Sequence, residues 1–332
     1  MTTESTLKSG LAPVRAQHHL SREEDGDDRE QKLDRIVPQG GHVSVMPKEV
    51  LELLAIKAGD VVLDATAGMG GHSESMLEAG AARVIALDAD PAAVEAARKR
   101  LARFGSRALV IESNFKNAAA ALAGAGVNEI TKALFDLGWN STQLMAGRGF
   151  SFMSDEPLNM SYGSTPASGF TAEQIVNTWS EKVLADVFFG YGEERYARRI
   201  AKKITEAREA APITTTAQLV AIINDAVPAA YRRGRIHPAT RSFQALRIAV
   251  NDELGSIEKG ISGAWEMLVA GGRVAVITFH SIEDRAVKRL FAALAKEKRG
   301  ALVIKKPLAS SAEEIAANPR SRSAKLRVIE KI

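Results

Sequence analysis

Residues 62–72 join a short apolar run to a cluster of glycines and read VLDATAGMGGH. A strand that runs directly into a glycine-rich turn and then a helix lets the backbone approach a ligand closely, because glycine has no Cβ atom. In an open α/β sheet such a ligand lies at the carboxyl ends of the strands. This stretch is therefore the first candidate for a binding site.

An acid follows at the distance that a nucleoside site requires. Asp88 lies 20 residues after Gly68, at the tip of the next predicted strand, where it can accept hydrogen bonds from a ribose diol. Ser73 stands where a dinucleotide fingerprint needs its third glycine, and no Gly-Lys-Ser/Thr follows to bind a polyphosphate. A nucleoside without phosphates is expected, which indicates S-adenosylmethionine. The alternative is a tight turn in which Asp88 only caps the next helix.

The elements that must position these residues alternate between strand and helix. Short apolar runs, typical of buried parallel strands, occur at 61–64, 83–88, 108–112 and 132–136, and helical patterns separate them. This alternation predicts a doubly wound α/β sheet.

The pattern changes after residue 141. Residues 142–239 contain loops and helical spacing but no convincing strand, which predicts an inserted helical domain. From Thr240, apolar residues at three-to-four spacing predict one long amphipathic helix as far as Ile261. The remaining predicted elements are a strand at 273–279, a helix with Ser281 as its N-cap, and terminal strands at 301–305 and 324–330 that form an antiparallel edge.

Composition excludes several classes of protein. With 45% hydrophobic and 25% charged residues among 332, the chain has the balance of a globular protein, and no apolar run approaches the roughly 18 residues that span a bilayer. It contains no cysteine, which excludes disulfides, thiolate metal sites and covalent catalysis by a thiol, and suits a reducing cytoplasm.

Charge is distributed unevenly along the chain. The 44 Lys and Arg exceed the 40 Asp and Glu by only 4, but residues 21–35 are almost wholly charged and predict a disordered tail over residues 1–38. Basic residues gather instead at 231–235 and 318–327. The ordered surface is therefore expected to be more basic than the total, which permits a nucleic-acid partner.

Seven motifs occur in an order that is typical of one enzyme family. They are GMGGH at 68–72, DLG at 136–138, RGFSF at 148–152, YGEER at 191–195, HPATRSFQALR at 237–247, FHSIEDR at 279–285 and NPRSRS at 318–323. With these motifs the chain resembles the bacterial 16S ribosomal RNA (cytosine-N4)-methyltransferases, the RsmH or MraW family, from about His42 to the C-terminus. The resemblance implies a class I S-adenosylmethionine-dependent methyltransferase fold, Rossmann-like with a mostly parallel seven-stranded sheet, and a helical insertion.

The resemblance also assigns a cofactor site. It comprises Gly70, Gly71, His72, Asp88, Phe115, Asp136 and Gln143. Local arguments agree for Asp88 at the ribose and for Phe115, which could cover the adenine face just after the third strand. His72 could equally be a histidine at a helix start that binds backbone. No metal ligand set is implied.

Two segments depart from the usual family pattern. Residues 136–145 read DLGWNSTQLM where the family usually has DLGVSSPQLD, and residues 157–162 read PLNMSY instead of PLDMRM. The cofactor contacts survive these changes. The effect of these changes on the substrate is left open. Either the target base differs from that of the family, or the chain belongs to a subgroup with its own pocket geometry.

Methyl transfer from a sulfonium depends mainly on positioning, because the leaving thioether is neutral. An exocyclic cytosine amine needs an acceptor for its hydrogens, and we expect Asp136 or nearby backbone carbonyls to supply it. Trp139 is the candidate platform for a flipped base, with packing between the two domains as its alternative. Asp136 and Trp139 are therefore the predicted catalytic residues.

Three arginines are predicted to contact RNA. Arg241 belongs to the 237–247 motif, while Arg320 and Arg322, two residues apart, could face phosphates together or form a solvated edge. Adjacent His280 and Ser281 diverge, so a hydrolase triad is not expected there, although this segment should border the active site.

The sequence thus predicts a methyltransferase that acts on the N4 amine of a cytidine in the decoding region of 16S rRNA. Residues 39–141 and 240–332 form the predicted methyltransferase domain, and 142–239 the substrate-recognition insertion. The expected partner is 16S rRNA in the small ribosomal subunit, in the cytoplasm, and a homodimer stays open. The alternatives are an RNA-binding assembly factor with weak or shifted transfer, and a nicotinamide-dependent oxidoreductase.

Overall fold

The structure is a computed structural model that describes residues 44–138 and 147–332. The chain divides into two compact units between Gly41 and His42, and the second unit, which ends at Ile332, contains every described residue. The predicted tail at 1–38 and two predicted site residues, Trp139 and Gln143, lie outside the described residues.

Eight strands form one sheet. Their bounds are β1 (Val61–Asp64), β2 (Arg83–Asp88), β3 (Ala108–Glu112), β4 (Ile130–Asp136), β5 (Leu268–Thr278), β6 (Gly300–Leu302), β7 (Leu308–Ala309) and β8 (Lys325–Lys331). The order is β3-β2-β1-β4-β5-β8-β6, with β7 paired to β8. Strands β1 to β5 run parallel to one another, whereas β8 is antiparallel to β5 and β6. The predicted sheet with an antiparallel edge is confirmed, and the two-residue β7 is an additional strand.

The direction of winding reverses at β1, which pairs with β2 on one side and with β4 on the other. At such a reversal the connections leave toward opposite faces of the sheet and open a crevice at the carboxyl ends of the strands. Asp64 ends β1, Asp88 ends β2 and Asp136 ends β4. The fold therefore brings three carboxylates to one edge of the sheet.

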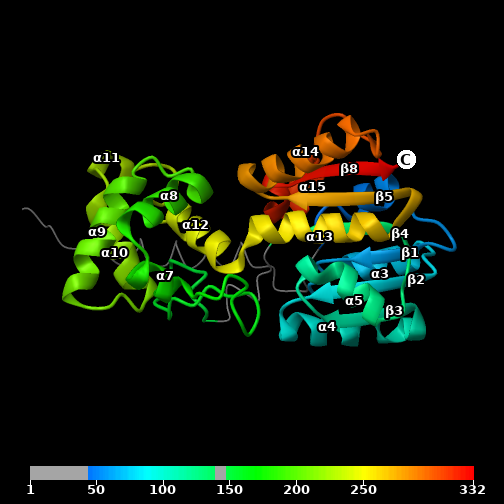
Figure 1. Cartoon of the computed structure of the whole chain (residues 1–332), viewed down its shortest axis with the longest axis horizontal. Coiled ribbons are helices and arrows are strands. Elements are labelled where there is room, and N and C mark those ends of the chain that lie inside the picture. Colours follow the sequence, from blue (N-terminus) through cyan, green and yellow to red (C-terminus); the bar gives the residue numbers. More distant parts are fainter. Residues whose placement is uncertain (1–43, 139–146) are drawn as a thin grey trace, which may run out of the picture. The chain divides into compact units, whose positions relative to one another are not determined.

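Helices cover both faces of this sheet. One layer contains α2 (Pro47–Leu54), α3 (Gly71–Glu78) and α4 (Pro91–Leu101), and the other contains α5 (Ala118–Gly124), α13 (Glu253–Met267) and α14 (Ser281–Lys296). In Figure 1 the yellow helix α13 runs alongside the strands. Side chains alternate between the layers: in β4, Leu134 packs with the first layer, whereas Ala133 and Phe135 pack with the second. Burial on both faces explains why the strands read as continuous apolar runs.

The residues between β4 and α13 build a separate helical core. Its helices, green to yellow in Figure 1, are α7 (Ala172–Thr178), α8 (Glu181–Gly192), α9 (Ala197–Ala210), α10 (Thr216–Ala226), α11 (Ala229–Arg232) and α12 (Thr240–Asn251). Buried apolar side chains from Leu158 to Val250 form one cluster. Of the residues described between 147 and 239, only Pro157 and Thr215 pair as strand residues do, in an isolated bridge. The change from strands to helices agrees with the sequence pattern.

The single helix predicted from Thr240 to Ile261 is wrong. Asp252 has a left-handed backbone, with φ 44° and ψ 46°, and it ends α12 and precedes α13. A left-handed residue cannot continue a right-handed helix. The apolar residues of α12 pack in the helical core, whereas Ile257 and Ile261 of α13 pack on the sheet. The break therefore lets two consecutive helices serve different cores.

The remaining short elements border the sheet. They are the 3₁₀ helices η1 (Ala102–Arg107), η2 (Phe115–Asn117) and η3 (Pro319–Ser323), and the helix α15 (Ala312–Ala317). Of these, η2 follows β3 and η3 precedes β8, so both lie next to strand ends.

Candidate active site

The glycine turn connects β1 to α3 and needs its glycines for two reasons. Gly68 and Gly70 have φ values of 51° and 82°, in the left-handed region that favours glycine. A Cβ atom on Gly71 would collide with the Ser44 hydroxyl oxygen. Gly70 is also the N-cap of α3, so the free N–H groups of this helix begin at the turn. The turn therefore exposes backbone donors at the carboxyl end of β1.

Asp88 is held against this turn by two hydrogen bonds. The Gly68 N–H donates to its Oδ2 and the Asp90 N–H donates to its Oδ1, both at 2.8 Å. Burial raises the pKa of Asp88 to about 6, against the opposing effect of these two bonds. Each carboxylate oxygen has two lone pairs, so one on each remains for a ribose hydroxyl. The carboxylate of Asp88 is therefore free to make the ribose contact that the sequence spacing predicts.

This pKa predicts that cofactor affinity depends on pH. A protonated Asp88 cannot accept from both hydroxyls of a diol, so affinity for S-adenosylhomocysteine should be constant above pH 7 and fall by up to about tenfold per unit below pH 6. Isothermal titration calorimetry between pH 5 and 8 measures this directly. The Asp88→Asn variant is the control, since its weaker affinity should lack this dependence. An equal slope in both proteins would assign the titration to another group.

Two buried polar atoms beside the turn lack hydrogen-bond partners among the described residues, His72 Nε2 and Asp136 Oδ1. His72 Nε2 lies 3.6 Å from Asp136 Oδ2. Below them, the fully buried Asp64 accepts from the Ser73 hydroxyl at 2.7 Å and from the Thr66 N–H at 3.3 Å. Burial raises the pKa of Asp64, partly countered by His72. Buried polar atoms normally find partners, so the free valences fit a polar ligand at this position.

Asp136 is positioned from β1. Its N–H donates to the Thr66 hydroxyl at 2.6 Å, and the N–H of the next residue, Leu137, donates to Ile277 in β5 at 3.0 Å. The carboxyl end of β4 is therefore fixed on both sides. This rigidity suits a residue that must place an acceptor accurately.

Phe115 lies at the start of η2, next to the tip of β3. Its ring meets Phe135 edge-on, with centroids 5.9 Å apart and planes at 87°. A Cβ atom on Gly260 of α13 would lie 2.7 Å from the ring. The ring is thus held from two sides near the edge that carries Asp88, as a residue covering an adenine would be.

The rim of the site is formed by the turn between β5 and α14. The N-cap of α14 is His280, which corrects the prediction of Ser281: His280 Nδ1 accepts from the Glu283 N–H, and the Glu283 carboxylate accepts from the His280 N–H, both at 3.4 Å. A Cβ atom on Gly138 would lie only 2.7 Å from the Phe279 ring. The rim therefore packs directly against the end of the β4 strand.

A buried network that the sequence did not reveal joins this rim to the helical core. Arg247 donates twice to Glu253, at 2.8 and 3.1 Å, and its guanidinium lies 3.2 Å from His280 Nε2. The Tyr162 hydroxyl donates to Glu253 at 2.8 Å. Burial alone would lower the pKa of Arg247, but the charge of Glu253 raises it above its ordinary value. Tyr162 stands where the family usually has Met, so this departure supplies a hydrogen bond.

Removing one partner of this network should destabilise the protein strongly. Arg247→Met leaves Glu253 buried without its cation, which typically costs about 3–5 kcal/mol. Urea denaturation monitored by tryptophan fluorescence gives the free energy of unfolding. The double variant with Glu253→Gln removes the stranded charge and should recover part of the loss. Equal losses in the single and double variants would contradict a role for charge pairing.

The same network contains the described residues that most resemble a metal site. Ligand atoms of Glu253, His280 and Glu283 lie within 4.8 Å of one another. The Arg247 guanidinium already binds Glu253 and contacts His280. A resident cation therefore takes the place that a metal ion would need.

A second unpredicted contact links the helical insertion to the cofactor edge. Arg148 donates to Asp90 Oδ2 at 2.7 Å and to the Tyr162 carbonyl oxygen at 2.8 Å. Asp90 caps α4 through its other oxygen and also donates its N–H to Asp88. A Cβ atom on Gly163 would lie 3.1 Å from the Ala89 carbonyl oxygen. The insertion thus rests on the turn that carries Asp88, the residue predicted to bind the ribose.

We expect Arg148→Met to weaken binding of S-adenosylhomocysteine by about 5- to 10-fold, because losing one charge-assisted bond loosens this turn by about 1 kcal/mol. Arg148→Lys, which keeps the charge, should retain most of the affinity. Calorimetry at pH 8, where Asp88 is ionised, makes the measurement. Unchanged affinity in Arg148→Met would show that the turn holds its shape without the insertion.

The three predicted RNA contacts differ in their surroundings. Arg241 donates to the Glu193 carbonyl oxygen at 3.1 Å. Arg320 and Arg322 lie on η3, where residues two apart point about 120° away from each other, so their spacing does not make them face phosphates together. Burial lowers the pKa of the half-buried Arg320, and the charge of Asp136 opposes this. Arg320 therefore lies near the active site, whereas Arg322 is exposed.

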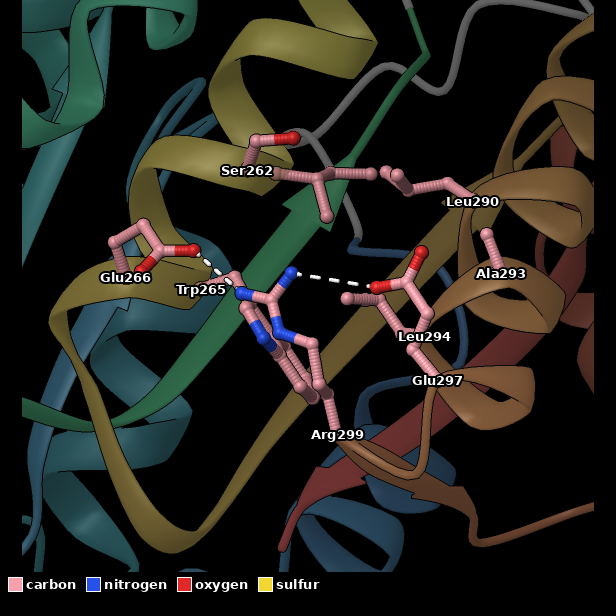
Figure 2. Close-up of a pocket in the computed structure, with 9 residues that line it drawn as sticks. Ser262, Trp265, Glu266, Leu290, Ala293, Leu294, Glu297 and Arg299 are labelled. Carbon is pink, nitrogen blue, oxygen red and sulfur yellow. Dashed lines mark hydrogen bonds and ion pairs between the residues drawn. The ribbon is translucent and has the colours of Figure 1, made fainter.

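A pocket of about 150 Å³ lies away from this edge, between the second half of α13 and that of α14. Figure 2 shows Arg299 between Glu266 and Glu297, at 2.7 and 3.5 Å. Leu268, where β5 begins, lies just beyond α13, so the pocket is at the amino end of that strand. Ligand sites in open α/β sheets usually lie at the carboxyl ends, which argues against this pocket as the cofactor site.

Comparison with known proteins decides the family. A sequence profile of the MraW methylase family matches residues 39–332. The chain belongs to the MraW methylase family. The Ribosomal RNA small subunit methyltransferase H of Geobacter sp. (strain M21) is 48% identical over 309 residues, covering 88% of this chain and 98% of that protein. The protein of the same name from Carboxydothermus hydrogenoformans is 46% identical over 307 residues, with the same coverage.

Membership of the MraW methylase family makes this protein a methyltransferase with S-adenosylmethionine as its cofactor. The oxidoreductase alternative is therefore wrong, and Ser73 in place of the third glycine agrees, since it is buried and bonded to Asp64. Among solved structures, an rRNA methylase from Streptococcus thermophilus is similar with a TM-score of 0.41 at 13% identity, covering 88% of this chain and 99% of that one. None of the helices in the described part of the chain is long and apolar enough to cross a membrane.

Proposed function

We propose that this methyltransferase methylates the N4 amine of a cytidine in the decoding region of 16S rRNA. The observation that carries the proposal is Asp136 Oδ1, a buried acceptor without a partner among the described residues, at the end of β4 and beside the glycine turn. The names of the relatives, which are small-subunit ribosomal RNA methyltransferases, support the substrate class.

Bound S-adenosylmethionine supplies an electrophilic methyl group on a sulfonium. The glycine turn offers backbone donors and no Cβ obstruction, and Asp88 accepts from the ribose. Phe115 covers one side of the nucleoside. The chain's remaining task is to hold the cytosine amine in line with the methyl group, where accurate positioning lowers the barrier most.

Asp136 performs this task through its free oxygen. By accepting a hydrogen bond from the amine, it raises the electron density on a nitrogen whose lone pair is otherwise delocalised into the ring, and it can take the proton after transfer. His72 Nε2 lies 3.6 Å from the other oxygen, without a hydrogen bond to it. Trp139, three residues after Asp136 in the sequence and outside the described residues, stays our candidate for stacking on the flipped base.

We further propose the domain organisation that the sequence predicts. Residues 39–141 and 240–332 form the methyltransferase domain, and 142–239 recognise the substrate, with α12 packing into the inserted helical core. The substrate is 16S rRNA assembled in the small subunit, which places the reaction in the cytoplasm. Homodimerisation is left to measurement of the molecular mass in solution.

The decisive experiment uses small subunits from a strain that lacks this modification. Wild-type protein and labelled S-adenosylmethionine are incubated with them, and the rRNA is digested to nucleosides. We expect labelled N4-methylcytidine from the decoding region. A label on another atom, or tight binding of subunits without transfer, would contradict the proposal, and the second result would favour an assembly factor.

A further inference from the structure

Six exposed arginines on the surface of the helical insertion lie within four residues of Tyr196 or Tyr231 in the sequence. They come from two segments, Arg195, Arg198 and Arg199 at the start of α9, and Arg232, Arg233 and Arg235 at the end of α11 and after it. We call this surface the arginine face. The sequence showed only its second segment as a basic run.

Aromatic contacts bring the two segments together. The rings of Tyr196 and Tyr231 meet edge-on, with centroids 5.0 Å apart. The Arg195 guanidinium lies 4.9 Å from the first ring centroid and 4.7 Å from the second, and Arg199 lies 5.8 Å from that of Tyr196. Arg232 directly follows Tyr231 in the chain. The two segments are therefore neighbours in space, with Arg195 lying over both rings.

The arginine face has no internal counter-charge. Within the described part of the chain, none of the six arginines forms an ion pair. The adjacent acid, Glu194, is fully buried and accepts from the Tyr231 hydroxyl at 2.6 Å and from the Tyr196 N–H at 2.8 Å.

Some cations elsewhere on the surface are, by contrast, paired within their own helix. Lys99, Lys182 and Lys203 each pair with a carboxylate of their own helix. Unpaired like charges at short range repel one another, and this repulsion is relieved only when an anion binds. The pattern therefore points to a polyanionic partner.

The position of the face connects it to the active-site rim. Glu193, two residues before Arg195, accepts from Ser281 at 3.0 Å and from Arg285 at 2.6 Å, both at the start of α14. Arg241 bonds to the carbonyl oxygen of the same Glu193. The arginine face thus begins where the rim ends. An RNA chain that leaves the active site at Asp136 can continue onto this face.

We infer that the arginine face binds the phosphate backbone of RNA next to the target nucleotide. This inference rests on the proposed function for the identity of the RNA. Guanidinium groups bind phosphate bidentately, and those stacked on Tyr rings are already ordered, so less entropy is lost on binding. Planar guanidinium and aromatic groups also suit the stacking of unpaired bases, which an acidic protein partner would not use.

The test removes three charges without touching the stacked arginines. The variant carries Arg198→Gln, Arg232→Gln and Arg233→Gln, and the matched control carries Lys99→Gln, Lys182→Gln and Lys203→Gln, with the same loss of charge from ion-paired positions. Both are titrated, saturated with S-adenosylhomocysteine, against a labelled decoding-region fragment of 16S rRNA at several salt concentrations. Calorimetry with S-adenosylhomocysteine checks that each variant is folded and binds cofactor as the wild type does.

We expect the arginine variant to lower the slope of log K against log salt by about 2, since each lost phosphate contact contributes about 0.7 to 0.9, and to bind RNA about 10- to 100-fold more weakly at 0.1 M salt. The control should keep the wild-type slope. A wild-type slope in the arginine variant would overturn the inference, even if wild-type protein forms N4-methylcytidine. Conversely, a reduced slope together with a wild type that forms no N4-methylcytidine would support the face and reject the proposed function.

Discussion

Replacing Asp136 with alanine is expected to lower the rate of methyl transfer by about 10²- to 10³-fold at saturating cofactor and RNA. The half-buried carboxylate ends β4, and its buried Oδ1 has no described partner, so the cytosine amine would be the group that satisfies it. A positioned acceptor of this kind typically contributes 10²- to 10⁴-fold. Single-turnover assays with modification-free small subunits measure the chemical step.

The assay also separates the two roles that the sequence assigned to Asp136. Loss of an acceptor for the amine lowers the single-turnover rate and leaves affinity for S-adenosylhomocysteine within a few-fold of the wild type. Loss of a cofactor contact does the reverse. Asp284→Ala is the matched control, because this carboxylate lies on α14 at the same edge but is bound to Arg327. A wild-type rate in Asp136→Ala would remove this residue from the mechanism.

Asp88→Ala is expected to weaken binding of S-adenosylhomocysteine by about 10²- to 10³-fold. The carboxylate has one lone pair left on each oxygen for the ribose, and two hydrogen bonds to a charged group contribute together about 3–4 kcal/mol. Calorimetry at pH 8 measures the loss with Asp88 fully ionised. RNA affinity should change little, since the ribose site and the arginine face use different residues.

The neighbouring strand offers a control for this variant. Glu112 pairs with Asp88 in register at the tip of β3 and is exposed. Glu112→Ala removes the same kind of charge from the same edge and should leave cofactor affinity within about twofold, as exposed charges contribute little. If both variants lost affinity equally, the negative charge at this edge of the sheet, and not a ribose contact of Asp88, would be responsible.

The sequence predicted those parts of the fold that depend on local patterns. β2 and β3 have the predicted bounds, 83–88 and 108–112, because strands buried on both faces read as apolar runs ended by polar residues. The break at Asp252 was not predictable in this way. Apolar spacing continues across it, and only the packing of α12 and α13 on different cores reveals why the chain must turn there.

In the candidate site, too, contacts within one local unit could be predicted from the sequence, whereas contacts between distant residues could not. Asp88 and the glycine turn are specified by residues 20 apart in one β-α-β unit, so their contact follows from the fold class. Arg148 and Asp90, or Tyr162 and Glu253, meet across 58 and 91 residues. No local pattern encodes such a pair, because either partner alone looks like an ordinary polar residue. The altered 157–162 segment was the one signal, and its Tyr162 proved to join the buried network.

The central pairing of β4 with β5 has a consequence for how the protein is made. These strands are separated in the chain by the whole helical insertion, and β5 in turn pairs with β8 at the C-terminus. The insertion's core, from Leu158 to Val250, is contiguous in sequence and can close as soon as it leaves the ribosome. The sheet, by contrast, cannot be completed until β5 and β8 have been added, so one edge of β4 stays unpaired while more than a hundred residues are made. The end of β4 that carries Asp136 is therefore fixed on both sides only after the insertion has been synthesised.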